Sequence, residues 1–162
     1  MKHSARLWAV AILAALATAS GAAQAKEDRH AGYYYPHPAQ IEEYTSRAQP
    51  IPDMQRRQRI LFVIGIVDQM SKRPYPPPVD LFVKGDEAEK LILVGNQDGR
   101  LNTIYRVRSL LARLTSSART LPILHEYKVA DTFNFLDLLK LLGFKQVTVS
   151  DGVALAHQIK LK

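Results

Sequence analysis

The sequence lacks cysteine altogether, which excludes disulfide bonds and thiolate metal sites as sources of stability. After its first residues it also lacks an apolar run long enough to cross a membrane. The longest such run, Ile60–Val67 (ILFVIGIV), has eight residues, whereas a spanning helix needs about 20. Acidic residues are the minority, with 15 Asp and Glu against 22 Lys and Arg. The fold must therefore be held by the burial of ordinary apolar side chains, under a basic surface.

The N-terminus contains the three parts of a secretory signal. Lys2 and Arg6 form a positive region, Leu7–Thr18 is apolar, and Ala23-Gln24-Ala25 is a small-x-small cleavage site. An uncleaved anchor helix is the alternative, although the apolar part is short for a spanning helix. We therefore expect residues 1–25 to be a signal peptide and the protein to be periplasmic or secreted. Its removal takes away two basic residues and no acidic one, so the net charge falls from +7 to +5.

The segment 26–52 shows neither a helical nor an alternating pattern. It contains four prolines and the triplet Tyr33-Tyr34-Tyr35, which favours a flexible, extended arm. A short turn of helix over Gln40–Arg47 is an alternative for part of it. A single domain is expected to occupy residues 53–162.

Three helices are predicted in this domain. Asp53 is a candidate N-cap for the first, which ends before Pro74, although a buried strand over Ile60–Val67 competes with it. The second is predicted to begin near Asn102. The third is predicted to begin after Asp131 or Thr132 and to end at Gly143 and Phe144, a typical C-terminal stop.

Two hairpins are predicted between and after these helices. Val79–Val83 pairs with Lys90–Val94, and Gln146–Val149 pairs with Ala154–Leu161 across an Asp151-Gly152 turn. Joined together, the hairpins predict an antiparallel four-stranded sheet with about three helices on one face, which is an α+β fold. The sequence leaves the strand order open.

Catalytic and metal-binding patterns are not evident. There is no G-x-S-x-G elbow, and the turn carboxylates Asp86, Glu87 and Glu89 do not have the spacing of an EF-hand loop. We therefore expect a non-enzymatic protein with no metal and no cofactor. His157, which lies among apolar residues of the last strand, is expected to be hydrogen-bonded and half-buried rather than a ligand.

A glycine-containing loop is the candidate ligand site. The segment Gly95–Arg100 (GNQDGR) runs from a strand into a helix, a setting in which backbone N–H groups can hold an anion. Gly95, Asn96, Gly99 and Arg100 are its candidate binding residues. The pattern matches neither common phosphate-binding motif, so an ordinary tight loop is the alternative.

A pair of arginines on the following helix is the candidate partner surface. Arg106 and Arg113 are seven residues apart and therefore share one helix face. An envelope protein or a polyanion is the expected partner, and nucleic acid is the less favoured one.

Two long stretches carry a resemblance to a known family. KGDEAEKLILVGNQDGRLNTIYRVRSLLARL (84–114) and FNFLDLLKLLGFKQVTVSDG (133–152) resemble a family of small exported bacterial proteins, with similarity from about Tyr44 to the C-terminus. Some members carry the label molybdopterin-guanine dinucleotide biosynthesis protein A, a cytoplasmic nucleotidyltransferase. The nucleotide-binding loop of that enzyme has adjacent glycines, whereas the nearest counterpart here, Val63–Pro74, has one glycine.

Two functions are therefore expected. The first is an exported, non-enzymatic domain that binds an envelope protein or a polyanion. The alternative, which the label of the resembled family implies, is a nucleotide- or molybdopterin-guanine dinucleotide-related role.

Overall fold

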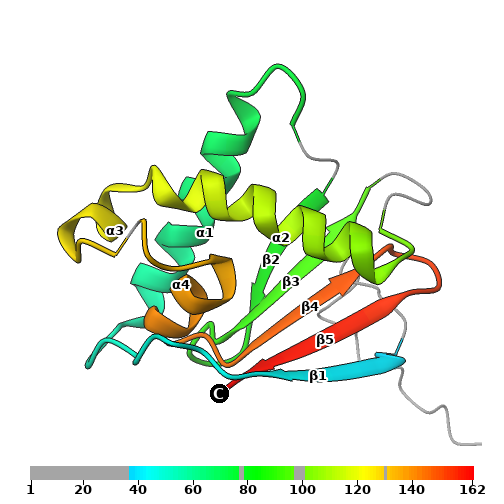
Figure 1. Ribbon diagram of the computed structural model, residues 1–162, viewed down its shortest axis with the longest axis horizontal. Coiled ribbons are helices and arrows are strands. Elements are labelled where there is room, and N and C mark those ends of the chain that lie inside the picture. Colours follow the sequence, from blue (N-terminus) through cyan, green and yellow to red (C-terminus); the bar gives the residue numbers. More distant parts are fainter. Residues whose placement is uncertain (1–36, 77–78, 97–100, 130) are drawn as a thin grey trace, which may run out of the picture. The chain divides into compact units, whose positions relative to one another are not determined.

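The computed structural model describes residues 37–76, 79–96, 101–129 and 131–162. These residues form one small α+β domain with four helices and a five-stranded mixed sheet (Figure 1). The expected signal peptide and the tyrosine triplet lie outside this part of the chain. Within it, no helix is both long enough and apolar enough to span a membrane.

The sheet differs from the predicted one. Its strands are β1 (Gln40–Tyr44), β2 (Val79–Lys84), β3 (Lys90–Gly95), β4 (Gln146–Ser150) and β5 (Ala156–Leu161), in the spatial order β1-β5-β4-β3-β2. The two predicted hairpins are confirmed, because β2 pairs antiparallel with β3, and β4 with β5. However, β3 and β4 run parallel, as do β1 and β5. The predicted antiparallel four-stranded sheet is therefore wrong.

The helices between the hairpins explain the parallel pair. After β3 the chain passes through α2 (Ile104–Arg119), α3 (Pro122–Glu126) and α4 (Phe135–Leu141) before it enters β4. A helical crossover of this kind returns the chain to the end of the sheet where β3 began, and parallel neighbours require such a connection. The hairpins were predicted correctly as separate units, but the crossover determines how they join.

The strand β1 lies within the segment that was predicted to be a flexible arm. Its backbone is paired along β5, and the Lys162 N–H donates to the Tyr44 carbonyl (2.9 Å) while the Ala39 N–H donates to the Ala156 carbonyl (3.1 Å). The alternative of a helical turn over Gln40–Arg47 is therefore wrong. The backbone partners that β5 offers decide the conformation here, because the side chains of QIEEY show no apolar alternation.

The helix α1 (Arg56–Ser71) confirms the helical interpretation of Ile60–Val67. The predicted caps are displaced by one to three residues. Asp53 has a positive φ of 58° and precedes the actual N-cap, Gln55, and α2 is capped by Thr103 instead of Asn102. Asn134, not Asp131 or Thr132, caps α4.

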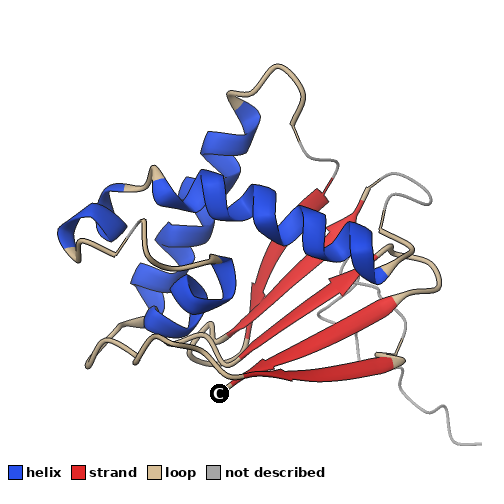
Figure 2. Cartoon of the chain, viewed as in Figure 1, coloured by secondary structure: helices blue, strands red, loops and turns tan. Residues whose placement is uncertain are grey.

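The core lies between the helices and one face of the sheet (Figure 2). Because side chains alternate along a strand, every second residue of β3 and β4 faces the helices. Leu91, Leu93, Val147 and Val149 occupy these positions and are fully buried. The predicted stop after α4 is confirmed: Gly143 has φ of 81°, and the side chain of Phe144 is fully buried.

Candidate functional site

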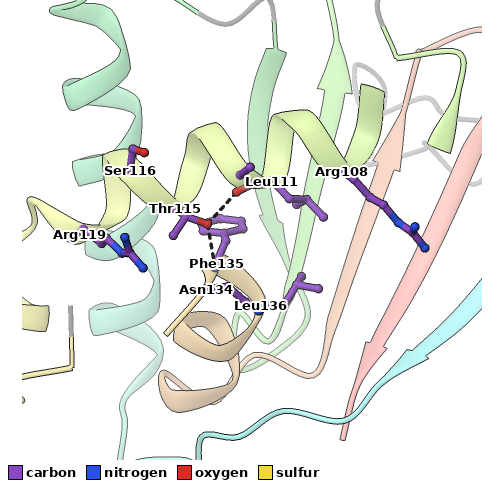
Figure 3. A pocket seen from close by; sticks show the side chains of 9 residues that line it. Arg108, Leu111, Thr115, Ser116, Arg119, Asn134, Phe135 and Leu136 are labelled. Atoms are coloured by element: carbon purple, nitrogen blue, oxygen red, sulfur yellow. Dashed lines mark hydrogen bonds between the residues drawn. The ribbon is translucent and has the colours of Figure 1, made fainter. Parts of the chain in front are cut away.

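An open groove of about 340 Å³ lies between α2 and the beginning of α4 (Figure 3). One wall is formed by α2 and the other by the first residues of α4 and its N-cap. The groove is lined by Arg108, Leu111, Ala112, Thr115, Ser116, Arg119, Asn134, Phe135 and Leu136.

The helical repeat explains why these α2 residues share one wall. Positions separated by three or four residues fall on the same helix face, and the lining residues of α2 follow this spacing from Arg108 to Arg119. Thr115 joins the two walls, because its hydroxyl donates to the Leu111 carbonyl (2.9 Å) and accepts from the Phe135 backbone N–H (3.0 Å). The groove is thus a consequence of α4 being anchored to α2 at its first turn.

Two arginines give the groove a positive charge. The lining contains Arg108 and Arg119 and no carboxylate. In the described part of the chain, neither forms an ion pair. Among the described residues, Arg119 is held only by long hydrogen bonds from Nη2 to the carbonyls of Asp131 (3.3 Å) and Phe133 (3.4 Å). Its buried Nε has no acceptor among the described residues.

The arginines Arg47 and Arg59 have a different role. Arg47 binds the carboxylate of Asp137 through Nη2 (2.9 Å) and Nε (3.2 Å). Arg59 is buried and donates to the backbone carbonyls of Glu87 (2.7 Å) and Met54 (2.9 Å). These contacts lie within the fold, whereas Arg108 and Arg119 line the groove.

Asp137 is the centre of a buried polar network beside the groove. Its Oδ1 accepts from the Tyr44 hydroxyl (3.1 Å), the Ser46 hydroxyl (3.0 Å) and the Arg47 backbone N–H (3.0 Å), and its Oδ2 from the Asn134 backbone N–H (3.4 Å). Burial alone would raise the pKa of Asp137, but the hydrogen bonds from Arg47, Ser46 and Asn134 outweigh it and hold the pKa below its ordinary value.

The same network fixes the position of a groove residue. The Asn134 side chain accepts from the Asp137 backbone N–H (3.0 Å) through Oδ1 and donates to the Tyr44 hydroxyl (2.7 Å) through Nδ2. The network therefore ties the end of β1 and the following residues to the first turn of α4. It serves to position the groove wall, and we assign it no chemical step.

The candidate residues of the glycine loop are only partly described. Gly95 is the last residue of β3, and a Cβ there would lie 3.3 Å from Leu101 Cδ1 and 3.6 Å from the Asp151 Cα. Close packing therefore accounts for glycine at this position without a ligand. Asn96 is exposed, whereas Gly99 and Arg100 lie outside the described residues. Neither Gly95 nor Asn96 lines the groove, and anion binding by this loop stays a prediction.

Arg106 and Arg113 are exposed on α2, but on a different side from the groove. At 100° per residue, their face is rotated by well over 90° from that of Arg108 and Arg119. Arg106 Nη1 donates to Asn102 Oδ1 (3.0 Å). Sequence reasoning therefore identified the basic helix but missed the two arginines that line the groove. Their spacing of eleven residues, about three helical turns, could have indicated that they share one helix face.

His157 is hydrogen-bonded, as predicted, and is buried more deeply than expected, with 4% of its surface exposed. Its Nδ1 lies 3.2 Å from Gln40 Oε1 and its Nε2 lies 3.0 Å from Glu42 Oε2, both from β1. Among the described residues, no group of three or more His, Cys, Asp or Glu side chains could hold a metal ion.

No family model, no curated protein and no solved structure matches the chain. Its function must therefore be argued from the groove itself. The arrangement can bind a group that combines negative charge with an apolar portion, because the arginines lie beside Leu111, Leu136 and Phe135. Thr115 and Ser116 have no histidine or carboxylate beside them in the lining, so the groove offers no activated nucleophile.

Proposed function

We propose that the chain is an exported, non-catalytic binding domain, and that its groove between α2 and α4 receives an acidic segment of an envelope protein. The observation that carries the proposal is the pair Arg108 and Arg119. Both flank an apolar floor, and neither has a carboxylate partner among the described residues.

The separation of the two arginines favours a peptide segment over a small anion. They are eleven residues apart on α2, so their Cα atoms lie about 16 Å apart along the helix axis at 1.5 Å per residue. An extended chain rises about 3.3 Å per residue and its side chains alternate, so acidic residues four positions apart point to the same side and span about 13 Å, a difference that the long arginine side chains can bridge. Figure 3 shows the guanidinium groups of Arg108 and Arg119 at opposite ends of the groove, so a single phosphate group would contact only one of them. The groove volume, near the lower end of the ~300–1,000 Å³ typical of ligand pockets, suits one or two apolar side chains between the charges.

The charge of the whole helix supports an acidic partner. The sequence of α2 contains four arginines and no Asp or Glu. Such a concentration of one sign attracts opposite charge and accelerates encounter. Each exposed ion pair contributes only about 0.2–1 kcal/mol, so the affinity is expected to be modest and to weaken with added salt.

The test uses a labelled, capped pentapeptide with glutamate at positions one and five and phenylalanine at position three, so that all three side chains point to the same side of an extended chain. Binding is followed by fluorescence anisotropy for the unaltered protein, for Arg108→Glu/Arg119→Glu and for Arg106→Glu/Arg113→Glu. The two double variants have the same net charge and differ only in the helix face that is altered. We expect the groove variant to weaken binding at least tenfold and the other variant to weaken it less than threefold.

The same titrations give the outcomes that contradict the proposal. Equal weakening by both double variants would show attraction by net charge alone. A larger effect of Arg106→Glu/Arg113→Glu would place the partner on the face that the sequence first indicated. A peptide with glutamine in place of both glutamates serves as the ligand control. Equal affinity for it would show that the negative charges of the peptide do not contribute to binding.

Export is a separate part of the proposal and has its own test. Cells that produce the full sequence are fractionated, and the intact mass of the protein is measured. A periplasmic or secreted species that begins at Lys26 is expected. An unprocessed cytoplasmic species would contradict export, and the nucleotide alternative would then be tested by thermal shift with GTP and Mg²⁺. A ligand at 100 times its dissociation constant adds about 2.7 kcal/mol to the free energy of unfolding.

A further inference from the structure

The face of the sheet that points away from the helices is buried at its centre. Ile92 of β3 and Thr148 of β4 are register partners and are 1% and 0% exposed. Both point to this outer face, because side chains alternate along a strand and the preceding Leu91 and Val147 face the helices. Two further residues of this face are fully buried, and we call the four together the outer cluster: Ile92, Thr148, Ser150 and Ala156.

The described helices do not account for the burial of the outer cluster. Buried residues of all four helices pack with the inward side chains of β3 and β4, whereas Ile92 and Ala156 are buried but lie outside this core. Figure 2 shows the helices on one side of the sheet. Side chains stand roughly perpendicular to a sheet, so neighbours on the same face cover their flanks and leave their ends open. An isoleucine with 1% exposure is therefore covered from above the outer face.

The strand order agrees with a cover over the central strands. β4 is the middle strand and β3 is its parallel neighbour, and parallel strands are ordinarily buried on both faces. Exposure on the outer face increases toward the β1 edge. Gln158 of β5 is half-buried, and Ile41 of β1 is 60% exposed. The cover therefore lies over β3 and β4 and leaves the side chains of β1 open.

The chain that precedes β1 begins beside the outer cluster. The Ala39 N–H donates to the Ala156 carbonyl (3.1 Å), and Ala156 pairs with Ser150. The residues Tyr33–Tyr35 precede Ala39 by four to six positions, which is a reach of about 13–20 Å for an extended chain. β4 and β3 lie two and three strands from β1, or about 10 and 14 Å at the usual strand spacing. The tyrosine triplet is thus long enough to reach them.

Tyrosine suits the chemistry of the outer cluster. Its ring is apolar and its end is polar, and the outer cluster combines two apolar side chains with two hydroxyl side chains. Three of the four are small, which leaves room for a ring above them. In an extended segment Tyr33 and Tyr35 point to one side and Tyr34 to the other, because side chains alternate.

We propose that residues 33–36 lie across the outer face of the sheet, with the rings of Tyr33 and Tyr35 packed on the outer cluster and Tyr34 directed to solvent. A segment of the same chain has an advantage over a separate partner, because its attachment at β1 gives it a high effective concentration. The signal cleavage expected after Ala25 leaves the triplet in place. The proposal is independent of the groove, which lies on the helical side between α2 and α4.

The test uses the absence of cysteine, which makes an introduced thiol a unique reporter. Thr148→Cys is made in the full sequence, and its reaction with a maleimide under native conditions is followed by intact mass. We expect it to react at least tenfold more slowly than Ile41→Cys, which is exposed on the same face. Tyr33→Ser/Tyr35→Ser is expected to accelerate the reaction of Thr148→Cys at least tenfold. Tyr34→Ser, the matched control, should change it less than threefold.

Two further reporters separate loss of the cover from loss of the fold. Val147→Cys places the thiol under the helices, and its reaction should stay slow in every tyrosine variant. Ile92→Cys is a second reporter in the outer cluster, and its smaller side chain does not displace the cover. Each reporter is first shown to be folded by urea unfolding, so that either outer thiol alone decides the question. The rates are also compared over a hundredfold range of protein concentration.

The proposal is overturned if the outer thiols react as fast as Ile41→Cys, because the face is then open. It is also overturned if Tyr33→Ser/Tyr35→Ser leaves them protected, or if their protection rises with protein concentration, since a different segment or a second copy is then the cover. Equal acceleration by Tyr34→Ser, or equal acceleration of Val147→Cys, would overturn the assignment of the two rings to the outer cluster.

Discussion

Arginine has several different roles in this domain, and the partner of each side chain distinguishes them. Arg59 is buried against backbone carbonyls, and Arg47 lies over Asp137 and near the ring of Phe133, whose centroid is 6.0 Å from its Cζ. Arg108 and Arg119 have no carboxylate partner in the described part of the chain. The first two stabilise the fold, and the second two are the cations that we assign to binding.

Replacement of Asp137 by asparagine is expected to lower the free energy of unfolding by about 2–4 kcal/mol. The carboxylate is fully buried and accepts from four residues, and a hydrogen bond to a charged acceptor contributes about 1.5–3 kcal/mol net. Asparagine would also place an uncharged amide, in place of the carboxylate, beside the positively charged Arg47 guanidinium. Urea unfolding measures the change.

The matched control is Arg47→Met, which removes the cation and keeps the carboxylate. The side chain of Arg47 is 62% exposed, so its loss is expected to cost only about 1 kcal/mol. A larger loss for Arg47→Met than for Asp137→Asn would mean that the ion pair, and not the buried acceptor, dominates the network.

Stability is expected to fall in acid because of Asp137 and Asp151. Burial would raise the pKa of Asp151, but hydrogen bonds from the backbone N–H groups of Val153, Leu155 and Ala154 outweigh it and lower the pKa, as happens at Asp137. A folded-state pKa below the unfolded value, about 3.9 for Asp, means that the unfolded chain binds protons more readily. The stabilisation is therefore complete above about pH 4 and is lost as the pH falls through the folded-state values.

Urea midpoints measured from pH 7 to pH 2 test this expectation. Asp137→Asn should give a shallower decline below about pH 4, because one of the linked groups is gone. Asp86→Asn, which alters an exposed turn residue outside both networks, should decline as the unaltered protein does. An unchanged acid slope in Asp137→Asn would contradict the assignment.

The network around Asp137 also shows what sequence reasoning cannot reach at the residue scale. The residue was predicted only as part of a helix, because its partners Tyr44 and Arg47 are 93 and 90 positions away in the chain. No local pattern links residues at such a distance. His157 was predicted to be hydrogen-bonded for a general reason, the cost of burying a polar group, but its partners in β1 could not be named.

At the scale of elements, the turn after α4 depends on glycine. Gly143 has φ of 81°, and an added Cβ would lie 2.8 Å from Nη1 of the buried Arg59. Gly143→Ala is therefore expected to lower the free energy of unfolding by about 2 kcal/mol, from left-handed backbone strain and the displacement of Arg59. Thermal or urea unfolding provides the measurement.

Gly65→Ala in α1 is the matched control. The same methyl group is added there to a helical residue, where alanine is intrinsically favoured by about 1 kcal/mol, and it meets the flexible end of Leu121. The net change is expected to stay within about 1 kcal/mol of zero. Equal losses at both positions would show that crowding, and not the backbone conformation at Gly143, determines the cost.

Elements were predicted better than their ends. The apolar spacing of α2, the hairpin patterns and the Gly143 stop are local signals, and each is confirmed by the structure. The caps were displaced because several polar residues near each helix start can serve as N-cap. Asn134 is chosen over Asp131 or Thr132 through its capping box with Asp137, which is local, and through its contact with Tyr44, which is tertiary.

At the scale of the whole molecule, the errors concern how elements join. The direction of β4 relative to β3 depends on a crossover of three helices, and the fifth strand comes from a segment without strand-like alternation. Local sequence patterns indicate neither the helical crossover nor the pairing of this fifth strand. For the same reason the groove was not predicted, since it exists only where α4 is anchored beside α2.

The contribution of β1 can be tested by comparing chains 37–162 and 46–162, which differ by the strand and its flanking residues. Loss of β1 removes the backbone partners of β5, exposes His157 and Ile159, and removes Tyr44 from the Asp137 network. We expect the shorter chain to lose about 3 kcal/mol or more of its free energy of unfolding. Its newly exposed β5 edge is also expected to cause aggregation that sedimentation velocity detects.

A variant of the longer chain distinguishes the contribution of the β1 backbone from that of the β1 side chains. Ile41 is 60% exposed, so Ile41→Lys in 37–162 keeps the β1 backbone and should change the free energy of unfolding by no more than about 0.5 kcal/mol. If 46–162 is as stable and as soluble as 37–162, β1 is a dispensable attachment and the domain is in effect a four-stranded one. If Ile41→Lys is as damaging as the deletion, the side chains of β1, and not its backbone pairing with β5, determine its contribution.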